Sequence, residues 1–328
     1  MKKIILSLIA LTFIIWSCSK DRSILLPVQI AEVIPTPTPT PPEKTIKDYT
    51  FDATNTQKVF DKLASKSEKK TIKSASDLPF IAKNGTKIWI EAQDLYLPDG
   101  TKATYPFDLE VLELLTPQDM ILHQKPTVSY GQLLTTGGEL FIKATKNNQE
   151  LSTRFFNNIS IIMPSQYVVP GMYVFNGSVT NTGFVEWQIQ KESPRQGVPS
   201  GVIAQDSGRT KSYVIFPSQI GWINCDKFYN YTGPKTKMTF NATYPEMKNI
   251  QTFIFFPNIK SVMGVYDGVS GDVPVGQLVK IISVAVTKDE KIFWFTKSLT
   301  ITPNEVVDIQ LVPTTEQEIQ SYLQSLTF

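Results

Sequence analysis

The stretch LVKIISVAVTKDEKIFWF, residues 278–295, holds two apolar segments on either side of a charged turn. The first segment, residues 278–286, is nearly continuously apolar and rich in β-branched residues, which is typical of a β-strand. The charged residues 288–291 predict a turn, and the aromatic residues 292–295 predict the returning strand. We therefore expect this part of the chain to form a β-hairpin.

A period-two alternation of apolar and polar residues predicts further strands from residue 87 onward. Residues 88–92 alternate in this way, and residues 107–111 do so again after a turn at Asp99-Gly100. Alternation puts one face of a strand in a core and the other toward water or a second layer. Further strand-like segments, separated by turn residues, are 139–145, 151–155, 173–179, 183–190, 212–216, 238–243 and 252–256.

Two segments have the period of a helix instead. Residues 56–63 carry apolar side chains at helical spacing and predict a short helix. Near the C-terminus, Thr315 and Glu318 have capping-box spacing, and Ile319, Tyr322, Leu323 and Leu326 form an apolar stripe. The fold class that we expect is all-β: tandem β-sandwich modules with a short N-terminal helix and a C-terminal amphipathic helix that docks on a sheet.

The N-terminus has the layout of a secretory leader. Lys2 and Lys3 are followed by an apolar run from Ile4 to Trp16 and by a small residue, Ser17, before Cys18. The run is shorter than the ~18 residues that a membrane-spanning helix needs. Residues 15–18 (IWSC) resemble a bacterial lipobox, which implies cleavage before Cys18 and acylation of that cysteine; the alternative is an ordinary leader with an incidental cysteine.

The segment after Cys18 is a linker by composition. Residues 35–42 (PTPTPTPP) predict a stiff polyproline II spacer. We therefore expect a signal peptide at 1–17, a lipid-anchored Pro/Thr-rich linker at 18–44, an N-terminal β-sandwich domain at 45–165 and a C-terminal β-sandwich domain with the terminal helix at 166–328. The expected location is the bacterial outer membrane, and which leaflet carries the protein stays open.

Charge and residue counts exclude several classes of function. Loss of Lys2 and Lys3 lowers the Lys+Arg count from 32 to 30, equal to the 30 Asp+Glu, so no basic surface for nucleic acid is expected. The lysines between residues 62 and 73 are interpreted as an exposed helix followed by a linker. After acylation of Cys18 only Cys225 remains, and His123 is the single histidine, which argues against disulfides, multi-histidine zinc sites and haem.

Two stretches resemble segments of large uncharacterised Bacteroidota surface lipoproteins. The first is residues 85–144, with TPQDMI at 116–121 and LLTTGG at 133–138, and the second is GWINCDKF at 221–228. In those proteins the first region is similar to the β-sandwich domain shared by ankyrins and netrin receptors. The resemblance covers less than a third of the chain. It implies sandwich modules used for scaffolding or contact, and it provides no catalytic residues.

The remaining candidate residues are interpreted as structural. Cys225 is expected to be a buried, inert thiol because apolar residues flank it, and His123 a surface residue of a polar loop. The segment 267–272 is read as a flexible hairpin turn and not as a calcium loop. The tryptophans in strand-like runs, which could stack on sugars, are assigned to cores; they are Trp89, Trp187, Trp222 and Trp294.

We therefore expect a non-enzymatic, lipid-anchored envelope protein whose β-sandwich modules make contacts with a protein partner, as a scaffold, an adhesin or a complex subunit. The alternative is a glycan-binding surface lipoprotein that assists an outer-membrane transporter. A hydrolase with paired carboxylates is a third hypothesis. The expectation includes no catalytic residue, no cofactor, no metal site and no nucleic acid. The expected partners are the membrane, through acyl chains on Cys18, and an envelope protein; a glycan is the partner in the alternative reading.

Overall fold

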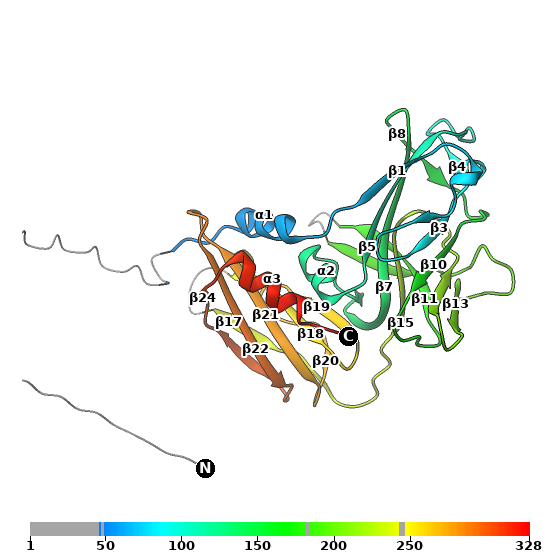
Figure 1. The fold of residues 1–328 in the computed structure, drawn as a ribbon. Helices are drawn as coiled ribbons and strands as arrows, with labels where there is room; N and C mark the ends of the chain where they lie inside the picture. The colour runs from blue at the N-terminus through cyan, green and yellow to red at the C-terminus, as the bar shows by residue number, and fades with distance from the viewer. Residues whose placement is uncertain (1–45, 47–48, 181–183, 243–246) are drawn as a thin grey trace, which may run out of the picture. The chain divides into compact units, whose positions relative to one another are not determined.

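The computed structural model describes residue 46 and residues 49–180, 184–242 and 247–328. The expected signal peptide, Cys18 and the Pro/Thr-rich linker lie outside these residues. The described chain is mostly β-strand, with three short α-helices: α1 (Ala53–Leu63), α2 (Pro117–Leu122) and α3 (Glu316–Gln324) (Figure 1). The all-β fold class is therefore confirmed.

The first sheet contains the longest strand, β7 (Gln132–Lys146), at its centre. It has the order β1 (Glu68–Ile72), β5 (Phe107–Leu114), β7, β15 (Gly221–Phe228), β11 (Tyr173–Val179) and β12 (Val185–Ile189). Two short strands, β6 (Val128–Ser129) and β8 (Gln149–Glu150), also pair with β7. We expected an exposed helix followed by a linker at residues 62–73, but residues 68–72 form β1, the edge strand of this sheet.

The second sheet faces the first across one hydrophobic core. Its order is β13 (Val202–Asp206), β14 (Lys211–Ile215), β10 (Ser160–Pro164), β3 (Lys87–Trp89) and β2 (Phe80–Ile81). The core takes alternate residues from both sheets, such as Ile88 and Ile161 from the second and Leu109 and Ile142 from the first. A separate pair, β4 (Leu95–Tyr96) with β9 (Ser152–Thr153), closes one end.

Both sheets join strands from either side of residue 165, where we expected a domain boundary. β15 pairs with β7 in the first sheet, and β14 pairs with β10 in the second. The expected boundary therefore falls inside the two sheets. The first core spans residues 72–225, whereas the next core is built mainly from residues 238–311.

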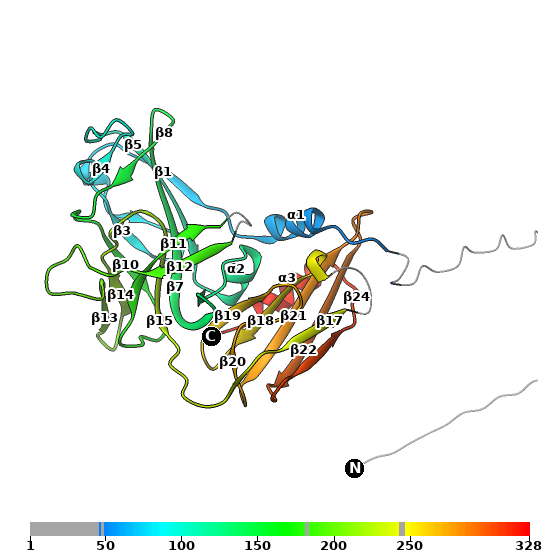
Figure 2. The same ribbon diagram turned by 180° about the vertical axis from the view of Figure 1, so that it is seen from behind.

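The third sheet has helices on one face and short strand pairs on the other (Figures 1 and 2). Its order is β19 (Ser261–Val265), β18 (Gln251–Phe256), β21 (Leu278–Val286), β22 (Ile292–Thr300) and β24 (Val312–Pro313). One face packs against β17 (Thr239–Ala242), β23 (Val306–Ile309), β16 (Lys235–Thr236) and β20 (Val273–Pro274). The hairpin that the opening stretch predicts is present as β21 and β22, joined by a turn in which Glu290 has φ of 63°.

All three helices contribute to the core on the other face of the third sheet. Phe60 of α1, Ile121 of α2 and Ile319 of α3 are buried there against Phe253 and Ile282. The capping box that we expected at the start of α3 is present, because Thr315 accepts from the N–H of Glu318 and the Glu318 carboxylate accepts from the N–H of Thr315. The predicted N-terminal and C-terminal helices are therefore confirmed.

Candidate functional site

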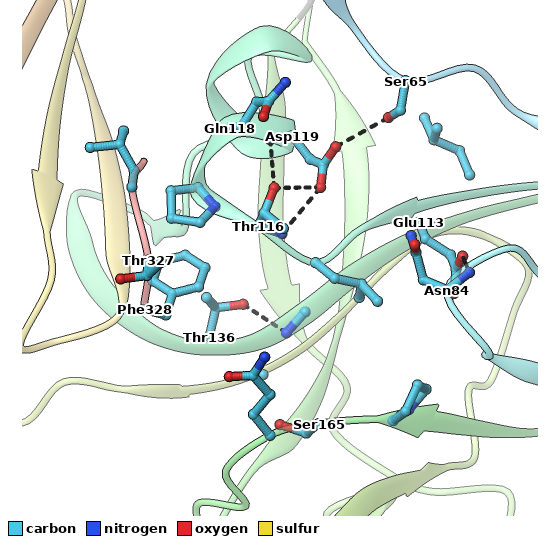
Figure 3. A pocket seen from close by; sticks show the side chains of 18 of the residues that line it. Ser65, Asn84, Glu113, Thr116, Gln118, Asp119, Thr136, Ser165, Thr327 and Phe328 are labelled. Atoms are coloured by element: carbon cyan, nitrogen blue, oxygen red, sulfur yellow. Dashed lines mark hydrogen bonds between the residues drawn. The ribbon is translucent and has the colours of Figure 1, made fainter. Parts of the chain in front are cut away.

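A groove of about 790 Å³ lies where the start of β1, α2, the centre of β7 and the C-terminus meet (Figure 3). The lining combines apolar, basic and acidic side chains with uncharged polar ones such as Ser65 and Thr116, so it matches neither a purely apolar ligand nor a purely ionic one. The apolar ones include Leu63, Leu112, Leu115, Pro164, Tyr167, Leu326 and Phe328, the basic ones are Lys66, Lys83 and Lys260, and the acidic ones are Glu68, Glu113 and Asp119.

Asp119 connects the start of α2 to the segment between α1 and β1 (Figure 3). Its Oδ2 accepts from the N–H of Thr116 at 3.2 Å and from the Thr116 hydroxyl at 2.6 Å. The Thr116 hydroxyl in turn accepts from the N–H of Asp119, which completes a capping box. Oδ1 accepts from the Ser65 hydroxyl at 3.2 Å. The carboxylate therefore fixes one wall of the groove.

His123 ends α2 and is half-buried, not a surface residue of a loop as expected. Its Nε2 lies 3.1 Å from Oγ of Ser65. Burial lowers the pKa of His123, and the negative charge of Asp119 opposes this shift. The sequence did not reveal α2, although Thr116-Pro117 with Asp119 is a helix-start pattern.

Ser65, His123 and Asp119 are the residue types of a hydrolase triad, but they are connected differently. In a triad the carboxylate holds Nδ1 of the histidine, and Nε2 takes the serine proton. Here Asp119 accepts a hydrogen bond from the serine hydroxyl itself. The carboxylate therefore positions Ser65 and does not orient His123 as a general base.

The turn at residues 83–86 forms the opposite wall and is held by two carboxylates, of which Glu113 is buried and Glu68 is partly exposed. Glu113 accepts from the N–H of Asn84 at 2.7 Å and from the N–H of Thr86 at 3.2 Å. Glu68 accepts from the N–H of Lys83 at 2.7 Å. These carboxylates therefore serve the backbone of the turn.

The centre of β7 contains a β-bulge that lines the groove. Between the pairs Glu139–Asn224 and Thr136–Asp226 the register shifts, and Gly137 and Gly138 together lie opposite one residue, Cys225. A side chain at Gly137 would meet the Tyr213 ring at 2.8 Å and the carbonyl of Cys225 at 3.0 Å. Only glycine therefore fits there without displacement of the Tyr213 ring or of the β15 backbone.

Behind this bulge lies a cluster of fully buried polar side chains. Glu139, Asn224 and Asp226 each have 0% exposure. Asn224 Nδ2 donates to Asp226 Oδ2 at 2.7 Å. Burial raises the pKa of Asp226 to about 8, although hydrogen bonds from Thr136, Asn224 and Gly137 lower it. Burial and the nearby Asp226 raise the pKa of Glu139 well above its usual range. This cluster could not be predicted from the sequence, because Glu139 lies on β7 and Asn224 and Asp226 on β15, and these strands are far apart in the chain.

Cys225 is buried, as expected. It faces the first core, and burial raises the pKa of its thiol well above the usual range. A thiol that stays protonated is a poor nucleophile. Nothing in this geometry favours a reactive cysteine.

Of the four tryptophans that we assigned to cores, Trp89 is the one that lines a surface hollow. Trp187 is fully buried, Trp222 contacts the Phe141 ring at 4.9 Å, and Trp294 contacts the Tyr322 ring at 5.5 Å. Trp89 instead lines a shallow hollow of about 360 Å³ on the outer face of the second sheet, together with Phe216, Glu91, Asp94 and Asn158.

The described residues contain no group of three or more His, Cys, Asp or Glu side chains arranged to hold a metal ion. The segment 267–272 contains a turn, in which the N–H of Val269 donates to the carbonyl of Tyr266. Within the described residues, no helix has the length and apolar character needed to span a membrane.

Comparisons with protein-family models, with curated proteins and with solved structures find no match to this chain.

Proposed function

We propose that the chain is a non-enzymatic, lipid-anchored protein of the bacterial outer membrane whose β modules bind another envelope protein through the groove. The observation that carries this proposal is the lining of the groove, where apolar side chains lie beside charges of both signs. Protein interfaces combine an apolar centre with a polar rim in this way. The first core, between the first two sheets, and the core between the third sheet and the short strand pairs support tandem sandwich modules, the architecture that the resemblance to surface lipoproteins implies.

The connections within the groove also favour binding over catalysis. Asp119, Glu68 and Glu113 accept hydrogen bonds from nearby backbone or serine donors. Carboxylates used in this way keep the walls of a binding surface in place. Asp119 binds the Ser65 hydroxyl and not the ring of His123, whereas in a serine hydrolase the carboxylate orients the histidine that acts as general base. The arrangement therefore does not favour a serine hydrolase.

Photo-crosslinking tests the proposed contact. Tyr167 lines the groove and is 59% exposed, whereas Phe156 lies outside its lining and is 86% exposed. A photoreactive amino acid at position 167, expressed in the native envelope, should give a discrete crosslinked protein band that position 156 does not give. Equal crosslinking at both positions, or none at 167, would contradict the proposed use of the groove.

The lipid anchor is tested separately from the contact. The full chain should carry acyl groups on Cys18, detectable by mass spectrometry, and partition into detergent. The Cys18→Ala variant should lose both properties. An unmodified N-terminus in the mature wild-type protein would remove the anchor from the proposal and leave the groove unaffected.

The hollow at Trp89 supports a second candidate function, glycan binding beside an outer-membrane transporter. An aromatic ring can stack on the apolar face of a sugar, and Glu91 and Asn158 offer groups that bind hydroxyls. Neutral oligosaccharides should quench the fluorescence of the wild type and not that of Trp89→Phe. Trp294→Phe, which changes a tryptophan packed on Tyr322, is the matched control.

A further inference from the structure

Four buried oxygen atoms without a hydrogen-bond partner gather in one place. Eight such side-chain atoms occur in the described residues, and four of them are both carboxylate oxygens of Glu139, Oδ1 of Asn224 and Oδ1 of Asp226. Native proteins leave few buried acceptors unpaired, and each calls for an unseen water, proton or ion.

Strand register brings these acceptors to one face of the first sheet. Glu139 of β7 lies directly opposite Asn224 of β15, and Asp226 follows two residues later on the same face. Directly opposite side chains in an antiparallel pair start roughly 4.5–5.5 Å apart. Asn224 Nδ2 donates to Asp226 Oδ2, whereas Oδ1 of Asn224 has no hydrogen-bond donor. Asn224 is thus the third acceptor side chain of the cluster, and it carries no charge.

All four unpaired atoms are oxygens, which are the ligands of hard cations. The neighbouring sulfur, in Cys225, faces the first core on the other side of the sheet. Transition metals prefer imidazole nitrogen and thiolate sulfur, and these three side chains offer neither. The set of ligands therefore favours a hard cation over a transition metal. Two carboxylates and an amide oxygen form a weaker set than the clusters of three or more acidic residues that hold divalent ions.

The charges within the cluster favour a monovalent ion. When both are ionised, Glu139 and Asp226 contribute two negative charges, and Lys125 interacts with Glu139 from the segment that covers this face, where its Nζ lies 5.1 Å from the centroid of the Trp222 ring. Asp119 also acts on Glu139, but its carboxylate accepts hydrogen bonds from Thr116 and Ser65 at the groove wall and is not part of the cluster. With Lys125 counted, the two ionised carboxylates keep one uncompensated charge, which one monovalent cation neutralises. The cation thereby favours the ionised carboxylates over the protonated forms that burial alone favours.

We propose that Glu139, Asn224 and Asp226 bind a monovalent metal cation of the Na⁺ or K⁺ class inside the first sheet. Access comes from the groove, since Thr136, the strand partner of Asp226, lines the groove with Gly137 and Gly138. The ion stabilises the bulge by giving four otherwise unpaired oxygens a common partner.

Thermal unfolding of the full chain at pH 8 tests the site. NaCl, KCl and choline chloride are compared at equal ionic strength, so that screening is the same and only the small cation differs. Na⁺ or K⁺ should raise Tm in a saturable way by at least about 2 °C over choline. Glu139→Gln should lose this dependence. Glu113→Gln, whose carboxylate partners are backbone N–H groups, should lower Tm and keep the dependence.

A crystal structure of the wild type grown in Tl⁺ gives a test that needs no variant. The proposal expects an anomalous peak among the oxygens of Glu139, Asn224 and Asp226. Absence of this peak together with equal Tm in all three salts overturns the proposal in favour of protonated carboxyls. Stabilisation by CaCl₂ and not by NaCl or KCl overturns the assigned valence.

Discussion

The backbone N–H of Val262 donates to the Thr127 hydroxyl at 2.8 Å, and the N–H of Thr127 donates to the carbonyl of Val262 at 2.9 Å. Thr127 precedes β6, which pairs with β7 of the first sheet, and Val262 belongs to β19 of the third sheet. Both residues are 0% exposed. These reciprocal bonds connect the part of the chain that contains the first core to the third sheet.

Thr127→Val should destabilise the protein, because it leaves the buried N–H of Val262 without its acceptor while it keeps the volume of the side chain. We expect a loss of about 1–3 kcal/mol in the free energy of unfolding, measured with chemical denaturant. Thr210→Val, at an exposed turn, is the control and should change it by less than about 0.5 kcal/mol. A loss for Thr127→Val no larger than that for the control would contradict this role.

Local strand and helix patterns predicted the elements of this fold better than their arrangement. The pattern in residues 278–295 predicted β21 and β22, and the capping box at Thr315 predicted α3. The boundary expected near residue 165 was a local inference, because Pro170-Gly171 is a turn pair between two groups of strand-like segments. It could not reveal that β15 inserts beside β7, because pairing between strands distant in sequence depends on tertiary contacts.

The candidate site was harder to predict for the same reason. The buried state of Cys225 followed from its apolar neighbours, since local composition reports the environment of one strand. The groove combines Ser65, Asp119 and Phe328, whose proximity no local pattern encodes. Glu139 and Asn224 are likewise separated by many residues and meet only through register.

His123 should titrate below the usual histidine range. It is the single histidine of the chain, so its ring signals in a ¹H–¹³C spectrum can be followed without ambiguity. Its pKa should lie below the value of about 6.5 in an unfolded chain, because burial penalises the charged ring. The folded state then binds fewer protons than the unfolded state near that pH, so the His123 contribution to stability is present above about pH 6.5 and decreases as the pH falls.

Asp119→Asn should lower the pKa of His123 further, because the charge of Asp119 favours the protonated ring. Asp61→Asn, on the exposed side of α1, is the control and should leave the pKa in place. A measured value at or above 6.5 in the wild type, or a rise in Asp119→Asn, is incompatible with this account of the site.

Gly137→Ala should destabilise the bulge behind the groove. The added methyl group meets the Tyr213 ring, which is buried and whose hydroxyl accepts from the N–H of Val169 at 2.7 Å, so the ring cannot move aside easily. We expect a cost of about 1–3 kcal/mol by denaturant titration. Gly264→Ala is the control, because its methyl group meets the hydroxyl end of Tyr266, whose side chain is 47% exposed and can shift toward solvent. Equal costs at the two positions would show that crowding by Tyr213 is not the cause.

Ile319→Ala tests whether α3 is an integral part of the third sheet's core. Ile319 is 1% exposed and belongs to the cluster that contains Phe253 and Ile282, so its truncation should cost about 2–5 kcal/mol of unfolding free energy. Thr315→Ala removes only the cap and should cost about 1 kcal/mol. Gln320→Ala, on the same helix, should change stability little, because it loses no buried apolar group. If Ile319→Ala lowers the free energy of unfolding no more than Thr315→Ala does, the packing of α3 on the third sheet contributes little to stability. The C-terminal wall of the groove would then be free to open.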